Sequence, residues 1–125
     1  MAVRVLVFDE TSIRIAAPLA PNINHRETFF GGSISGMGIL AGWTLLHLNL
    51  VREEIEHRLV VQRSATDYLV PAEGDVETAC SLSSPKDWSK FIDTLSRKGK
   101  ARIHLKAQTS VAGEAVAEHQ AAYVA

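Results

Sequence analysis

The sequence predicts an α+β protein with a single domain, residues 1–125, in which an antiparallel sheet wraps around one long buried helix. One stretch, residues 33–51, carries no Asp, Glu, Lys or Arg and is long enough for a core helix. Short segments of alternating or β-branched apolar residues lie on both sides of it. The resulting order lacks the strand–helix alternation of parallel α/β folds, because four strands with only a small inserted helix follow the long helix. The length, 125 residues, also fits one domain.

Composition narrows the class of protein further. Hydrophobic residues make up 46% of the chain and charged residues 22%, as in ordinary globular proteins. The net charge of -1 argues against bulk electrostatic binding to nucleic acid or to an anionic membrane. The single cysteine, Cys80, cannot form an intramolecular disulfide, and we expect a small buried side chain rather than a nucleophile. We therefore expect a cytoplasmic protein without a metal or other cofactor.

The first two strands are expected at residues 3–8 and 12–16. Both segments are rich in β-branched residues, and residues 9–11 are suited to the turn between them. A proline- and asparagine-containing loop follows over residues 18–24.

The long apolar helix is expected to begin near Gly32 and to end in the charged run 52–56. Its apolar stretch could just span a bilayer, and it contains small-residue pairs typical of membrane helix dimers. However, His47 and Asn49 are polar, and the surrounding strands need an apolar element to cover. We therefore favour a buried core helix, whose glycines would let the sheet approach the backbone closely.

Residues 59–68 and 76–82 are expected to form the next two strands. Ser84 and Pro85 are typical of an N-cap followed by the first helical residue. The amphipathic pattern of this short helix consists of Trp88, Phe91, Ile92 and Leu95.

The last part of the chain is expected to form a hairpin. Gly99 ends the short helix, and residues 101–107 then alternate regularly between apolar and basic side chains. Residues 111–114 are suited to a turn, and residues 114–124 form the final strand.

Several common motifs are absent or incomplete. Residues 36–41 match G-x-G-x-x-A, but no strand precedes the first glycine, so we interpret the match as chance. Neither a complete G-x-S-x-G nor a phosphate-binding P-loop is present. The five histidines lack the i, i+2 or i, i+4 spacing of a compact metal site.

The segment 21–33 is the most informative part of the chain for function. It runs from a polar loop through Gly31 and Gly32 into the apolar helix. The first N–H groups of a helix have no intrahelical partner and carry the positive end of the helix dipole. Glycines there would admit the oxygen of a ligand, and the amides could polarise a carbonyl group. The alternative is an N-terminal turn that only packs against its own sheet.

A second candidate is a basic run of four residues: Arg97, Lys98, Lys100 and Arg102. It could be a solvated turn, or it could hold the phosphate groups of a nucleotide.

Two motifs resemble the hotdog-fold acyl thioesterases: Asn24-x-x-x-Thr28-x-x-Gly-Gly-Ser33 and Tyr68-Leu-Val-Pro71-x-x-Gly-Asp75. Four motifs together are similar to one subfamily, the thioesterase-like domain found C-terminal to GNAT acetyltransferases in some bacteria. They are Ala17-Pro-Leu-Ala-Pro-Asn-Ile-Asn24, Phe30-Gly-Gly-Ser33, Ala41-Gly-Trp43 and Lys100-Ala-Arg-Ile103, and the resemblance covers the whole chain. It implies the hotdog fold, in which a sheet surrounds a central helix. It also implies a homodimer or homotetramer with sites at the protomer interface.

The resemblance implies hydrolysis of an acyl-CoA or acyl carrier protein thioester. The amides of Gly31 and Gly32 would bind the thioester oxygen, and Asn24 would orient the substrate or water. Two carboxylates could activate the water: Glu27, a few residues before the double glycine, and Asp67, from across the dimer. The expected substrate-binding residues are Phe30, Ser33, Met37, Ile39, Leu40 and Tyr68, with Arg97, Lys98, Lys100 and Arg102 at the phosphates of CoA.

The sequence departs from the family pattern in the helix. Many relatives have a carboxylate about seven residues after the double glycine, where this chain has Ile39, and His before it, where this chain has Phe30. A non-catalytic module with the same fold, which binds acyl-CoA or serves in assembly, is therefore the alternative function. A hotdog dehydratase is a weaker alternative, because His25 does not match the pattern of those enzymes.

Overall fold

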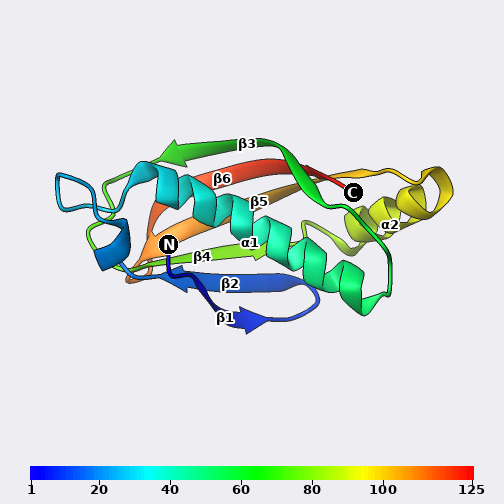
Figure 1. The fold of residues 1–125 in the computed structure, drawn as a ribbon, viewed down its shortest axis with the longest axis horizontal. Helices are drawn as coiled ribbons and strands as arrows, with labels where there is room; N and C mark the ends of the chain where they lie inside the picture. Colours follow the sequence, from blue (N-terminus) through cyan, green and yellow to red (C-terminus); the bar gives the residue numbers. More distant parts are fainter.

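The computed structural model describes all of residues 1–125, and its main feature is a six-stranded sheet curved around one helix (Figure 1). Its helices are α1 (Gly31–Arg52) and α2 (Pro85–Lys98), with a 3-10 turn at Ala20–Asn22. The strands are β1 (Arg4–Phe8), β2 (Ser12–Ala17), β3 (Val60–Tyr68), β4 (Val76–Ser81), β5 (Arg102–Val111) and β6 (Glu114–Val124).

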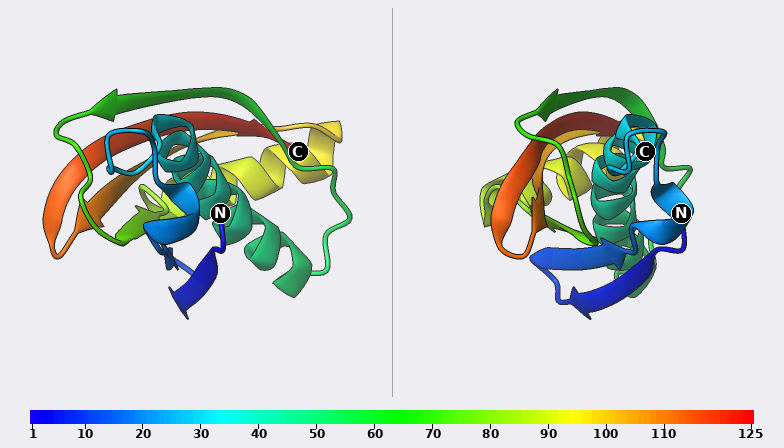
Figure 2. Two further views of the ribbon diagram at one scale, coloured as in Figure 1. Left: turned by 60° about the vertical axis from the view of Figure 1, so that its left-hand side comes forward. Right: turned by 90° about the vertical axis from the view of Figure 1, so that its left-hand side faces the viewer.

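All strand pairs are antiparallel, and the strand order is β1-β2-β4-β5-β6-β3. After α1 the chain therefore crosses to the far edge of the sheet, where β3 pairs only with β6. The sheet curls around α1, so that the helix lies in its concave face (Figure 2). The predicted α+β class and the buried central helix are confirmed.

The core lies between α1 and the concave face of the sheet. The predicted alternation is confirmed on β5, where Ile103 and Leu105 are buried while Arg102, His104 and Lys106 are exposed. Other buried apolar side chains come from α1 and from the strands β2, β4 and β6. They include Ile13, Ile15, Met37, Leu45, Leu46, Leu50, Val76 and Tyr123.

Two glycines let α1 approach β6 closely, as expected from the sequence. A Cβ atom on Gly38 would overlap the imidazole ring of His119, and one on Gly42 would overlap the phenol of Tyr123. The Tyr123 hydroxyl donates a hydrogen bond to the Ile39 carbonyl oxygen at 2.7 Å. These contacts set the position of the helix along the strand.

The boundaries of the elements agree with the sequence analysis except in detail. The helix α1 begins one residue earlier, at Gly31, and ends at Arg52, before the rest of the charged run. The strand β5 continues past the alternating residues 101–107 to Val111, where the predicted turn begins, and it pairs with β6 over this whole length. That turn places Ala112 and Gly113 at positive φ, as a tight hairpin requires.

The small helix α2 follows the predicted signals at both ends. The Ser84 side chain accepts a hydrogen bond from the Asp87 amide at 3.2 Å, and Pro85 is the first helical residue. Gly99 ends the helix in the left-handed conformation, with φ of 74°.

By length and composition alone, α1 is apolar enough to cross a bilayer, with a mean hydropathy of 1.4 over its most apolar window. Half of that window is buried inside this fold. A helix buried in the core of a soluble protein meets the same criteria.

Candidate functional site

The loop that leads into α1 is fixed by buried anchors at both ends. The Asn22 side chain is buried and donates to the Met1 and Pro18 carbonyl oxygens at 2.9 and 2.8 Å. The backbone carbonyl oxygen of Asn22 accepts a hydrogen bond from the Phe30 amide at 2.7 Å. Phe29 is buried in the core, and its amide donates to the Ala72 carbonyl oxygen. The double glycine that follows therefore has a defined position.

Within this loop, the Asn24 side chain holds a tight turn. Its Oδ1 atom accepts hydrogen bonds from the Arg26 and Thr28 amides at 2.9 and 3.1 Å, and its Nδ2 atom donates to Thr28 Oγ1 at 2.9 Å. The predicted role of Asn24 in orienting substrate stays a prediction, but its polar atoms have local partners already. Glu27 is exposed at the tip of the turn with φ of 61°, a conformation that costs about 1 kcal/mol or more for a residue with a Cβ.

The amides of Gly31 and Gly32 are the first two N–H groups of α1, and neither makes a hydrogen bond in the structure. Phe30 is the N-cap and provides no side-chain acceptor, while its carbonyl oxygen accepts from the Ser33 and Ile34 amides. Phe30 is 56% exposed, and its ring lies over Gly32. Two free donors at the positive end of the helix dipole are thus available for an anionic or carbonyl oxygen.

Tyr68, at the end of the edge strand β3, lies beside the double glycine. Its hydroxyl donates to the Gly31 carbonyl oxygen at 2.7 Å, and a Cβ on Gly31 would lie 3.6 Å from the ring. The structure therefore brings together five of the predicted residues around the start of α1: Phe30, Gly31, Gly32, Ser33 and Tyr68.

The predicted apolar lining is divided between core and surface. Met37 is completely buried and belongs to the core, whereas Ile39 and Leu40 are only half-buried. Met37 thus faces the sheet, because the concave face packs directly against it.

Asp67 is not brought to the double glycine. It lies between Thr66 and Tyr68 on β3, so the alternation of the strand turns it to the opposite, outer face of the sheet. There it lines a shallow cleft of about 750 Å³ together with Lys106 and Glu118. Asp67 is therefore far from the double glycine of its own protomer, and its expected role from across the dimer stays a prediction.

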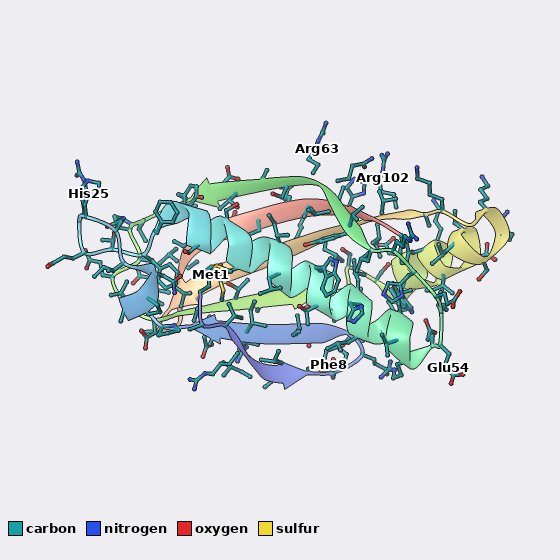
Figure 3. All side chains as sticks on the ribbon, viewed as in Figure 1. Met1, Phe8, His25, Glu54, Arg63 and Arg102 are labelled. Atoms are coloured by element: carbon teal, nitrogen blue, oxygen red, sulfur yellow. The ribbon has the colours of Figure 1, made fainter.

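The basic run also lies away from the double glycine. It spans the end of α2 and the start of β5, at the opposite end of the protomer, as the labels of His25 and Arg102 show (Figure 3). Arg97 forms an exposed ion pair with Asp93 at 3.0 Å. One protomer alone therefore does not place Lys98, Lys100 and Arg102 beside the glycines.

Two further groups of polar residues come together only in the fold. His47 Nδ1 and His57 Nε2 lie 2.9 Å apart, and the His47 ring stacks on Trp43. His119 is 4% exposed, and its ring nitrogens contact the hydroxyl groups of Thr66 and Thr109. For the group around His119, the signal in the sequence was polar residues at inward-facing strand positions, among them Thr78 on the apolar face of β4.

The other titratable groups of the core are not suited to catalysis. Cys80 is buried, as expected, and burial raises the pKa of its thiol to about 12. Burial and the neighbouring Cys80 both raise the pKa of the Tyr123 hydroxyl. Burial lowers the pKa of His119, which keeps its imidazole neutral at physiological pH. No group of three or more His, Cys, Asp or Glu side chains gathers in a metal-binding arrangement.

Comparisons with known proteins agree with this architecture. A family model described as "Putative thioesterase (yiiD_Cterm)" matches residues 1–125. A Chlorobaculum tepidum protein of unknown function is 28% identical over 99% of this chain and 82% of its own, with a TM-score of 0.93. A protein from Shewanella oneidensis, named a putative thioesterase, is 27% identical over 100% of this chain and 83% of its own, with a TM-score of 0.85. A Haemophilus influenzae thioesterase, 12% identical over 98% and 78% of the two chains, has the same fold with a TM-score of 0.75. The chain therefore belongs to this thioesterase family, with the hotdog fold and thioester hydrolysis as its class of reaction.

Proposed function

We propose that the protein hydrolyses the thioester of an acyl-CoA or an acyl carrier protein at the N-terminus of α1. The observation that carries this proposal is the pair of unpartnered amides of Gly31 and Gly32. These donors would hold the thioester carbonyl oxygen and stabilise the negative charge that develops on it. A water oxygen then bonds to the carbonyl carbon, the carbon–sulfur bond breaks, and the products are a carboxylic acid and a thiol.

The active unit that we propose is a homodimer formed through β3. This strand has nine residues and an unpaired outer edge, and two of its apolar residues, Val60 and Tyr68, are 56% and 55% exposed. A long exposed edge with apolar side chains is suited to pairing with a second chain. Antiparallel pairing of two such edges reverses the partner, so that the other end of its sheet moves toward the double glycine. In that arrangement, the basic run of one protomer, residues 97–102, would lie near the double glycine of the other and could bind the phosphates of CoA.

The edge can be tested by comparing the two outer strands. We expect Ala65→Asp, at the middle of β3, to convert the dimer into a monomer in analytical ultracentrifugation, because carboxylates would face each other across the new interface. Val7→Asp on the opposite edge strand β1 is the matched control, since Val7 is also exposed. A monomeric wild-type protein, or a dimer lost only in the Val7 variant, would contradict the proposed interface.

The activity is tested by thiol release from a panel of short, long and aryl acyl-CoAs. Gly31→Pro removes one donor, and proline is tolerated as the first residue of a helix because its missing N–H has no intrahelical partner there. Gly31→Ala is the matched control, because it adds a Cβ with an ordinary 3.6 Å contact to Tyr68 and keeps the amide. We expect about a 10²-fold loss of kcat/KM for the proline variant alone.

Acyl binding without catalysis is the second candidate function. It is favoured by α1 itself, which has no carboxylate before its C-terminal end. An acyl-CoA that raises the melting temperature of the wild-type protein without any thiol release would support this function and exclude the hydrolase. The predicted relation to domains that follow GNAT acetyltransferases stays a prediction.

A further inference from the structure

A row of hydrogen-bonded side chains crosses the concave face of the sheet beneath α1. Thr78 Oγ1 on β4 lies 2.7 Å from Thr109 Oγ1 on β5, which lies 2.7 Å from His119 Nε2 on β6. His119 Nδ1 in turn lies 2.9 Å from Thr66 Oγ1 on β3. The row thus runs from the fully buried interior to the edge strand, where Thr66 is half-buried.

The direction of these hydrogen bonds follows from the buried end. Thr78 is completely buried, and the Thr109 hydroxyl is the one partner of its side chain. A buried hydroxyl that donates to nothing is costly, so Thr78 donates to Thr109. Thr109 must then donate to Nε2 of His119, and the proton of the neutral imidazole lies on Nδ1, which donates to Thr66.

This assignment leaves the hydroxyl hydrogen of Thr66 without a partner in the row. Aligned hydrogen bonds polarise one another, so the donor at the end of the row is stronger than an isolated hydroxyl. The row is also rigid, because the His119 ring fills the space above Gly38.

The free hydroxyl lies on the same side of β3 as the candidate site. Thr66 and Tyr68 share the inward face of the strand, about 7 Å apart along it. Tyr68 is bonded to Gly31, and Gly38 beneath His119 lies two helical turns after Gly31. Along the side of β3 that faces the first half of α1, Tyr68 thus lies beside the free amides and Thr66 lies further along.

We propose that the Thr66 hydroxyl is a ligand-facing hydrogen-bond donor to the thioester group, and that His119 is the residue that positions it. The proposal rests on the proposed function for the identity of the ligand. Thr66 would stabilise the charge that develops on the reacting group, as a donor in addition to the glycine amides. Such a role for Thr66 would also explain why a row of polar side chains lies in the core.

The first test compares Thr66→Val with Thr66→Ser in thiol release by the purified protein. Valine matches the shape of threonine but lacks the hydroxyl, and we expect kcat/KM to fall by about 10²-fold. The melting temperature should also fall, because the buried His119 Nδ1 proton loses its acceptor, while the circular dichroism spectrum stays that of the wild-type protein. Serine keeps the hydroxyl and is expected to retain most of the activity. Equal activity of the valine variant and the wild-type protein would overturn the proposal.

The second test is a double-mutant cycle with His119→Gln. If His119 acts through Thr66, its replacement lowers kcat/KM in the wild-type background and has little further effect in the Thr66→Val background. Full additivity of the two losses, in variants that have the wild-type circular dichroism spectrum, would mean that His119 does not position Thr66.

A binding measurement separates this proposal from the hydrolase itself. The probes are an acyl-CoA ketone analogue, in which CH2 replaces the sulfur, and an S-alkyl-CoA that lacks the carbonyl group. We expect Thr66→Val to weaken binding of the ketone about tenfold or more and to leave the S-alkyl compound unchanged. If no thioester is hydrolysed but this difference persists, the proposed reaction fails while the role of Thr66 stands. If thioesters are hydrolysed and the difference is absent, the role of Thr66 fails.

Discussion

The imidazole of His119 lies over Gly38 of α1 so closely that a Cβ on that glycine would approach Nδ1 to well under 3.0 Å. We therefore expect Gly38→Ala to lower the free energy of unfolding by about 1–3 kcal/mol, because the helix must move away from β6. The control is Gly36→Ala, whose Cβ would meet only the flexible Met1 side chain at 3.3 Å. Alanine is the better helix former, so this variant is expected to gain up to about 1 kcal/mol. Urea denaturation of both variants measures this difference. Equal midpoint concentrations for Gly38→Ala and Gly36→Ala would contradict the close contact between Gly38 and His119.

The unfolding free energy is expected to depend on pH through His119. Burial lowers the pKa of its imidazole below the ordinary value of 6.5, so below that pH the unfolded chain binds more protons than the folded one. The stabilisation is complete above pH 6.5 and declines as the pH falls toward the lowered pKa, by at most about 1.4 kcal/mol per pH unit. Urea denaturation at several pH values should show this decline, and His119→Gln should flatten it. An unchanged slope in that variant would assign the effect to other groups.

Gly32→Val is expected to abolish turnover while the dimer persists. The added side chain would stand in front of the free amides, and its Cβ would lie 2.5 Å from the Phe30 ring. Because that ring is exposed and can rotate away, the fold should be retained. Thiol release and sedimentation of the same sample provide the measurement. Full activity in this variant would remove the proposal that the helix amides hold the thioester oxygen.

Variants of Asn24 separate a role in the loop from a direct role in binding. Asn24→Ala removes the acceptor of the Arg26 and Thr28 amides and should cost about 1–2 kcal/mol of stability, along with activity. Asn24→Asp keeps that acceptor and should retain most of both. Should the aspartate variant be stable but inactive, the Asn24 amide group would have to contact the substrate or water directly.

Glu27 offers two variants with different expected effects. Glu27→Gly relieves the positive φ, at 61°, and is expected to raise stability by up to about 1 kcal/mol, after the extra flexibility of the unfolded chain is subtracted. Glu27→Gln keeps the strain and removes the charge. If Glu27 is the base that activates water, thiol release falls in both variants. If both hydrolyse thioesters at the wild-type rate, the base must come from elsewhere.

Much of the candidate site could be located from local sequence. Gly31 and Gly32 at the start of an apolar helix predicted the free amides, since the first N–H groups of any helix lack intrahelical partners. The side chains around them were harder to place. Asn24 was expected to face substrate, yet its amide group is occupied within its own turn. The contact between His119 and Thr66, 53 residues apart, depends on two strands becoming neighbours, and nothing local specifies that.

Several features of the fold could be predicted from the amino-acid sequence: the types of element and their order, the burial of α1, the cap of α2 at Ser84 and the hairpin at Ala112-Gly113. These features follow from side-chain periodicity, capping groups and turn residues, which act over a few neighbouring positions. Three other features are seen first in the folded chain: β3 pairs with β6 at the edge of the sheet, Asp67 faces away from the double glycine of its own protomer, and a polar row ends at Thr66. These outcomes depend on which strands lie side by side, and that is set by the packing of the whole sheet around one helix.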